Sequence, residues 1–329
     1  MRPGLIDLAS SRSGGRAVLA SDEFFAPKAN LLKPRRGVFI EGKYTSRGKW
    51  MDGWETRRRR TPGFDWCIIQ LGVPGEIKSV TVDTHHFKGN HPEACSLTAA
   101  ELSSAPKPPV LKKSAERWSE ILSRSPLHPD AENEFVIRGS ERCTHVRLLI
   151  YPDGGVARLR VWGEARPDWE RLRGRKGAID LVAIEHGGVP LAASDEFFSE
   201  PINLLMPGPS ADMGDGWETR RRRGPGNDWV IVRLGARGSI NEVVVDTTHF
   251  KGNFPESCRL EACDATDLAP GAIPDERVQW REVVPRTRLG PDRRHRFKAV
   301  GRSGPVTHVR FSIFPDGGVA RLRVLGRPV

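Results

Sequence analysis

The chain contains the same domain-length pattern twice. A nine-residue string, Asp-Gly-Trp-Glu-Thr-Arg-Arg-Arg-Arg, begins at Asp52 and recurs unchanged at Asp215, so the offset is 215 − 52 = 163 residues. The same offset carries residues 152–161 onto residues 315–324, again unchanged. A period of this length corresponds to a whole domain and is far longer than a solenoid repeat. The sequence therefore predicts one domain made twice.

The repeat also predicts the domain boundaries. The string Ser-Asp-Glu-Phe-Phe at Ser21 returns at Ser194, with an offset of 194 − 21 = 173, so the first copy holds an insertion before Asp52. A chain of 329 residues fits two domains that each bury a core. We expect a first repeat, a charged linker and a second repeat over residues 1–163, 164–177 and 178–329.

Composition limits the partners and the compartment. The net charge is +11, but the basic residues are spread along the chain and are densest inside the repeated string. Because no single-strand-binding alternation of aromatic and basic residues accompanies them, we expect no nucleic-acid partner. No apolar run reaches the ~18 residues of a membrane span, and the N-terminus lacks the apolar core of a signal peptide. Five cysteines without paired spacing indicate free thiols and a cytoplasmic location.

Short runs that alternate apolar and polar residues recur in both copies, which is typical of strands with one wet face. Clusters of Gly, Pro, Asn and Asp separate them. The sequence therefore predicts an all-β fold, an antiparallel jelly-roll β-sandwich in each copy. One short helix is expected over residues 115–123, and the Phe pairs at 24–25 and 197–198 are expected to anchor the cores. The expected strands cover residues 66–71, 77–82, 144–150 and 157–161, with 229–234, 240–245, 307–313 and 320–324 in the second copy.

The repeated Glu-Thr-Arg string is the first candidate site. If it is a strand, Glu55, Arg57 and Arg59 share one face, because successive side chains alternate. An Arg beside a Glu can hold a planar carboxylate or a urea oxygen. The alternative is a solvated, salt-bridged strand. Because a core requires only apolar volume, the unchanged return of the polar string at Glu218 and Arg220 favours ligand contact.

A second group lies where an expected strand enters a Gly-Asn turn. It contains Asp83, His86 and Asn90, and the second copy repeats it as Asp246, His249 and Asn253. Histidine is a natural general acid or base near neutral pH. Two alternatives stay open: a histidine that only satisfies a loop backbone, or an Asp–His pair that binds a divalent metal.

A third group follows the repeated Pro-Asp-Gly-Gly turn. Asp153 and Arg158 recur as Asp316 and Arg321 and could project into a pocket. The turn chemistry of Pro-Asp-Gly-Gly explains the motif equally well without a ligand.

The motifs in combination resemble the allantoicase family. The strings SDEFF, DGWETRRRR, VDTxHFKGN and PDGGVARLR, each present twice, span nearly the whole chain. The resemblance implies a tandem jelly-roll hydrolase that converts allantoate and water into ureidoglycolate and urea in purine breakdown. It also implies a small anionic ureido substrate and a homo-oligomer. No cofactor is required by any motif, and a divalent metal stays open.

Under this resemblance the candidate residues take roles. The groups available for proton transfer are Glu55, Asp83 and His86, with Glu218, Asp246 and His249 in the second repeat. The groups available for substrate binding are Arg57, Asn90, Asp153 and Arg158, with Arg220, Asn253, Asp316 and Arg321 in the second repeat.

The repeats are not equivalent, and the activity has a rival. Only the first repeat has His85 and His91, where the second has Thr248 and Phe254. Two working sites, one working site and one shared site therefore all stay open. The rival is a non-enzymatic ligand-binding jelly roll, which predicts secretion and disulfides; the absence of a signal peptide and the odd number of cysteines count against it.

Overall fold

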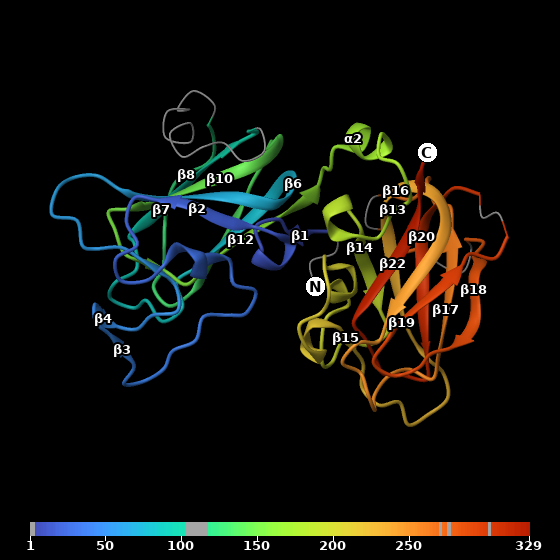
Figure 1. The fold of residues 1–329 in the computed structure, drawn as a ribbon. Coiled ribbons are helices and arrows are strands. Elements are labelled where there is room, and N and C mark those ends of the chain that lie inside the picture. The colour runs from blue at the N-terminus through green and yellow to red at the C-terminus, as the bar shows by residue number, and fades with distance from the viewer. Residues whose placement is uncertain (1–3, 103–117, 270–271, 275–277, 302–303) are drawn as a thin grey trace. The chain divides into compact units, whose positions relative to one another are not determined.

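The computed structural model describes every residue except 1–3, 103–117, 270–271, 275–277 and 302–303. The chain forms two compact units, one spanning Ile6–Arg166 and the other containing Pro167–Val329 (Figure 1). A five-residue helix, α2 (Trp169–Arg173), lies in the segment expected as a linker. No helix in the described part of the chain is long and apolar enough to cross a membrane.

The first unit is built around one long strand, β6 (Asp65–Asp83), and its strand pairs are antiparallel. The first half of β6 pairs with different strands from the second half, so β6 belongs to both layers of a sandwich. One layer contains β2 (Arg16–Ala20), β10 (Arg142–Tyr151), β7 (Ala94–Ala100) and β8 (Ser119–Pro126), and the other contains β9 (Glu132–Val136), β12 (Arg158–Ala165) and β1 (Ile6–Asp7).

The second unit repeats this arrangement around β16 (Asp228–Asp246). The expected all-β fold of two tandem jelly rolls is confirmed. One layer contains β14 (Val189–Ala193), β20 (Val306–Phe314), β17 (Ser257–Cys263) and β18 (Arg281–Arg288), and the other contains β19 (Arg294–Lys298), β22 (Arg321–Pro328) and β13 (Ile179–Asp180).

The central strand is longer than the sequence pattern predicted. Two strands were expected over residues 66–71 and 77–82, with a turn at the glycines between them, but β6 continues through. A Cβ on Gly72 would lie 2.4 Å from the carbonyl oxygen of Ser13, and one on Gly75 would lie 2.3 Å from that of Glu164. These glycines therefore allow close backbone approach and do not make a turn.

Two further expectations are wrong. Of the helix expected over residues 115–123, residues 119–123 belong to strand β8, and residues 115–117 lie outside the described residues. The Phe pairs do not anchor the cores, because Phe24 is 38% exposed and both Phe197 and Phe198 are 61% exposed. The ring of Phe24 instead lies against the guanidinium of Arg57, and that of Phe197 against Arg220.

Buried tryptophans fix the repeated string in each unit. Trp54 and Trp217 are fully buried, and their indole N–H groups donate to the carbonyls of Asp22 and Asp195 at 2.8 and 2.9 Å. Each Trp begins a two-residue strand that ends on a Glu. These strands are β5 (Trp54–Glu55), which pairs with β11 (Gly155–Val156), and β15 (Trp217–Glu218), which pairs with β21 (Gly318–Val319).

Candidate active site

A carboxylate–amide pair is the centre of the candidate site in each repeat. In the second repeat the Nδ2 of Asn253 donates to Oε1 of Glu218 at 2.6 Å. In the first repeat Asn90 donates to Glu55 at 2.7 Å. The structure therefore brings together two residues that the sequence placed in separate motifs, 35 positions apart.

The Glu218–Asn253 pair lines a cleft of about 870 Å³. Its other polar lining residues include Arg221, Arg222 and Asp316. Apolar side chains complete the wall, and its size suits a small molecule. The apolar lining side chains are Phe198, Phe254, Leu289 and Pro315.

The environment of Glu55 changes its acidity. Burial raises the pKa of the Glu55 carboxyl above its ordinary value, and the hydrogen bond from Asn90 partly offsets this rise. A carboxyl whose pKa is moved toward neutrality can exchange a proton with a bound molecule, which is the property of a general acid or base.

The Pro-Asp-Gly-Gly turn joins the site through its aspartate. Oδ2 of Asp316 accepts the backbone N–H of Arg222 at 2.8 Å, and Oδ2 of Asp153 accepts that of Arg59 at 2.8 Å. The side chains of these arginines turn toward buried carboxylates, Arg222 to Asp228 at 2.6 Å. The turn and the arginine string are thus held to each other in both repeats.

The repeated string is not a continuous strand, so the expectation that Glu55, Arg57 and Arg59 share one strand face is wrong. Strand β5 ends at Glu55, so Glu55, Arg57 and Arg59 do not share one side of a strand. Arg57 is exposed and ion-paired with Asp22 at 3.0 Å, whereas Arg59 pairs with Asp65 at 3.1 Å.

The second repeat separates its arginines in the same way. Arg220 pairs with Asp195 at 3.0 Å. It lines a different depression of the surface, beside Phe197, and is not among the residues that line the Glu218 cleft.

Arg158 and Arg321 are buried and hold backbone. The guanidinium of Arg158 donates to the carbonyls of Asp52, Arg35 and Arg36 and to Oδ2 of Asp52, the last at 2.6 Å. Arg321 makes the matching contacts with Asp215 and the segment before it. In the structure these arginines fix the loop that leads into the repeated string.

His86 and His249 also contact backbone. Both have positive φ, 69° and 75°, and each backbone N–H is accepted by an aspartate, Asp130 or Asp292, at 2.8 Å. The Nε2 of His86 lies 3.2 Å from the carbonyl of Gly37, and that of His249 lies 3.0 Å from the carbonyl of Ser210. Each ring thus ties its turn to the loop before the repeated string.

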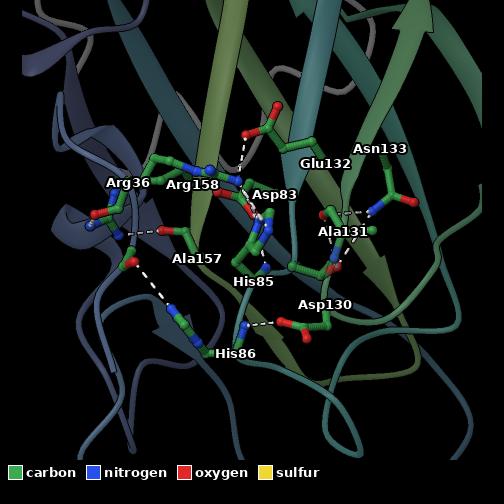
Figure 2. A network of polar contacts seen from close by, with 12 residues as sticks. Arg36, Asp83, His85, His86, Asp130, Ala131, Glu132, Asn133, Ala157 and Arg158 are labelled. Carbon is green, nitrogen blue, oxygen red and sulfur yellow. Dashed lines mark hydrogen bonds and ion pairs between the residues drawn. The ribbon is translucent and has the colours of Figure 1, made fainter. Parts of the chain in front are cut away.

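Asp83 belongs to a polar cluster found in the first repeat (Figure 2). Nδ1 of His85 lies 2.7 Å from Oδ1 of Asp83, and Glu132 stands opposite Asp83 on the neighbouring strand β9. Ligand atoms of these three side chains lie within 4.8 Å of one another, as a divalent metal would require. The metal alternative therefore involves His85, not His86.

An arginine of the insertion already contacts two members of this cluster. Nη2 of Arg36 lies 3.1 Å from Oε1 of Glu132 and 3.0 Å from Nε2 of His85. A metal bound here would have to displace that guanidinium. Figure 2 shows Arg36 beside Asp83, His85 and Glu132.

The second repeat has changed the same positions. Thr248 replaces His85, and Arg294 occupies the position opposite Asp246 that Glu132 occupies opposite Asp83. Arg294 pairs with Asp246 at 2.8 Å. The charge at this position is therefore reversed between repeats, and the metal-ligand geometry belongs to the first repeat alone within the described residues.

Some of these residues could not be selected from the sequence. Glu132 and Arg288, which also lines the Glu218 cleft, are single charged residues outside the repeated strings, and Arg36 lies in the unrepeated insertion, so none carries a repeat signal. Asp22 and Asp195 did carry one, since both stand in the repeated Ser-Asp-Glu-Phe-Phe string.

Comparison with known proteins identifies the family. The family model described as allantoicase repeat matches residues 6–166 and 179–329. A protein named probable allantoicase 1 from Burkholderia mallei is 46% identical over 98% of this chain and 94% of its own length. A probable allantoicase from Pseudomonas paraeruginosa is 47% identical over 98% of this chain and 96% of its own length.

A solved structure agrees with this assignment. The crystal structure of allantoicase from Saccharomyces cerevisiae has a TM-score of 0.84 and 36% identity, and it covers 99% of this chain and 94% of its own. Family model, sequence relatives and structure thus match both repeats over nearly their full length. The chain belongs to the allantoicase family.

Proposed function

We propose that this chain hydrolyses allantoate to ureidoglycolate and urea in purine breakdown, and that the Glu–Asn pair of each repeat is the reaction centre. Family membership gives the reaction class. The single observation that carries the location is the half-buried glutamate held by an asparagine at 2.6–2.7 Å in both repeats, on a cleft in the second.

The reaction requires a proton donor and a proton acceptor. Allantoate carries one carboxylate and two ureido groups on one carbon. The bond from that carbon to one ureido nitrogen breaks, the nitrogen gains a proton and leaves in urea, and the hydroxyl of water ends on the carbon. Because urea is a better leaving group when its nitrogen is protonated, a carboxyl with a raised pKa, such as Glu55, suits the role of donor.

The asparagine has two functions in this proposal. Its Nδ2–H fixes one oxygen of the glutamate, which leaves the other carboxylate oxygen for the substrate. Its own Oδ1 can accept an N–H from a ureido group. Asn90 and Asn253 thus orient both the proton-transfer group and the substrate.

The other predicted roles stay predictions. Proton transfer by Asp83, His86, Asp246 or His249 has to be reconciled with the contacts that each already makes to its loop. Substrate contact by Arg158 or Arg321 has to be reconciled with their burial, at 2% and 3% exposure.

The cellular setting is part of the proposal. All five cysteines are unpaired and buried, which suits a reducing cytoplasm. Assembly into a homo-oligomer also stays a proposal, and sedimentation or light scattering of the purified protein measures it directly.

The test is urea release from allantoate by purified protein, before and after chelator treatment. The proposal predicts one urea per allantoate, and no release in either condition would refute it. Loss of activity on chelation with restoration by a divalent ion would transfer the chemistry to Asp83, His85 and Glu132.

Matched variants Glu55→Gln and Glu218→Gln show which repeat works. If both variants lose the same part of the urea-release activity, both repeats are active. If only one variant loses activity, only that repeat is active.

A further inference from the structure

The Glu218 cleft presents both signs of charge to its ligand. Glu218, Glu256 and Asp316 contribute carboxylates to the lining, and Arg221, Arg222 and Arg288 contribute guanidinium groups. An anionic ligand is repelled by the carboxylates and must be met by a cation that is not already neutralised. The partners of the three arginines therefore decide which one is available.

Two of the three arginines are already paired. Arg222 holds the buried carboxylate of Asp228 at 2.6 Å. Nε of Arg288 lies 3.6 Å from Oε1 of Glu256. Arg221 has no side-chain hydrogen bond, ion pair or ring contact among the described residues.

The backbone on both sides of Arg221 is fixed. The N–H of Thr219 donates to the carbonyl of Gly317 at 3.1 Å, and the N–H of Arg222 donates to Asp316 at 2.8 Å. The chain around Arg221 is therefore held against the turn that lines the same cleft, which limits where this unpaired side chain can reach.

The first repeat holds Arg58 in the same way. Thr56 donates to the carbonyl of Gly154 at 3.1 Å, and the N–H of Arg59 donates to Asp153 at 2.8 Å. Arg58 also has no side-chain partner among the described residues. An unpaired guanidinium between two backbone anchors is thus a feature of both repeats.

We propose that Arg221, and Arg58 in the first repeat, bind the substrate carboxylate in place of Arg220 and Arg57, which the family resemblance had suggested as substrate-binding residues. A guanidinium offers two parallel N–H donors that match a carboxylate. Arg220 and Arg57 are instead committed to Asp195 and Asp22. This assignment rests on the proposed hydrolysis of allantoate and adds the residue that selects an anionic substrate.

The repeats differ beside this guanidinium. The backbone N–H of Leu289 donates to the backbone carbonyl of Glu256, as that of Leu127 donates to the backbone carbonyl of Glu93, so Arg288 of the second repeat corresponds to Pro126 of the first. In the second repeat Arg288 offsets the negative charge of Glu256, whereas Pro126 cannot offset that of the corresponding Glu93. We therefore expect the carboxylate to bind more tightly in the second repeat.

The test compares matched charge-removing variants. Arg58→Gln/Arg221→Gln removes the two proposed carboxylate-binding arginines. Arg60→Gln/Arg223→Gln removes two other exposed arginines of the same string, of which Arg223 does not line the Glu218 cleft. We measure KM for allantoate, the inhibition constant of its neutral carboxamide analogue, and thermal unfolding. The first double variant should raise KM on the order of 10- to 100-fold, while the control double variant should leave it unchanged.

The analogue isolates the charge interaction. Its inhibition constant should be nearly the same in wild type and Arg58→Gln/Arg221→Gln, because it has no carboxylate. The assignment would be overturned by equal KM values in the two double variants. It would also be overturned if Arg58→Gln/Arg221→Gln weakened the binding of allantoate and of its carboxamide analogue by the same factor. A wild-type protein that releases no urea would instead refute the proposed function. The Arg221→Gln single variant should raise KM more than Arg58→Gln.

Discussion

Replacement of Arg158 by Met tests whether this arginine supports a loop or contacts the substrate. Arg158 is 2% exposed, and its guanidinium donates to both the backbone carbonyl and the carboxylate of Asp52. Removing one partner of a buried ion pair costs about 3–5 kcal/mol. Because Asp52 keeps Lys33 at 2.8 Å and the N–H of Val38 at 3.2 Å, we expect the lower end, about 3 kcal/mol.

This loss should be visible in thermal unfolding. For a domain of this size, 1 kcal/mol shifts Tm by about 2–4 °C, so Arg158→Met should lower the transition of the first repeat by about 6–12 °C. Differential scanning calorimetry is suited to this measurement because the two units can unfold in separate transitions. Arg321→Met should lower the transition of the second repeat in the same way, since its contacts match.

Arg158→Lys is the matched variant. It keeps the charge and loses the fork of donors, so its Tm should lie between wild type and Arg158→Met. If Arg158→Met leaves Tm unchanged and raises KM for allantoate, the loop-supporting role is refuted and Arg158 contacts the substrate.

Three further changes probe other parts of the structure. Asn90→Ala removes a hydrogen bond that lowers the pKa of Glu55, so the pKa of this proton donor should rise and the alkaline limb of the first repeat's kcat/KM profile should move to higher pH. Gly318→Ala places a Cβ 1.9 Å from the ring of Phe250, and calorimetry should show that the free energy of unfolding falls by about 1–3 kcal/mol or more. Burial raises the pKa of Asp180 to about 6, against about 3.9 when unfolded. The unfolded state therefore releases this proton first, and the stability advantage of wild type over Asp180→Asn should fall from about pH 4 to pH 6 in denaturant titrations.

The repeat and the strand periodicity were sufficient to predict the fold class. Alternation over residues 144–150 and 307–313 became β10 and β20, because alternating apolar residues can bury one face of a sheet. The continuation of strand β6 through residues 71–77 was not predictable from local sequence. The glycines there lie against the backbone of distant segments, at Ser13 and Glu164. Local turn propensity contains no information about such long-range contacts.

The candidate site was predicted in its residue types more than in its pairings. Glu55 and Asn90 were both selected, but their contact depends on two loops meeting. His86 was selected over His85 because only His86 recurs in the second repeat, yet His85 is the histidine beside Asp83. Recurrence therefore detects what both repeats share, and it misses features of one repeat.

The arginine string shows the same limit. A strand was assumed through residues 54–60, which placed Arg57 beside Glu55, but the strand ends at Glu55 and the following residues separate. Which arginine is unpaired depends on Asp22 and Asp65, which come from different parts of the chain.

The most direct test of the central claim is steady-state urea release from allantoate by the Glu55→Gln/Glu218→Gln double variant, with calorimetry to show that it remains folded. If these glutamates transfer the proton, kcat should fall on the order of 10²-fold or more while Tm stays near that of wild type. Turnover near the wild-type rate in a folded double variant would contradict the account and move the chemistry away from the Glu–Asn pairs.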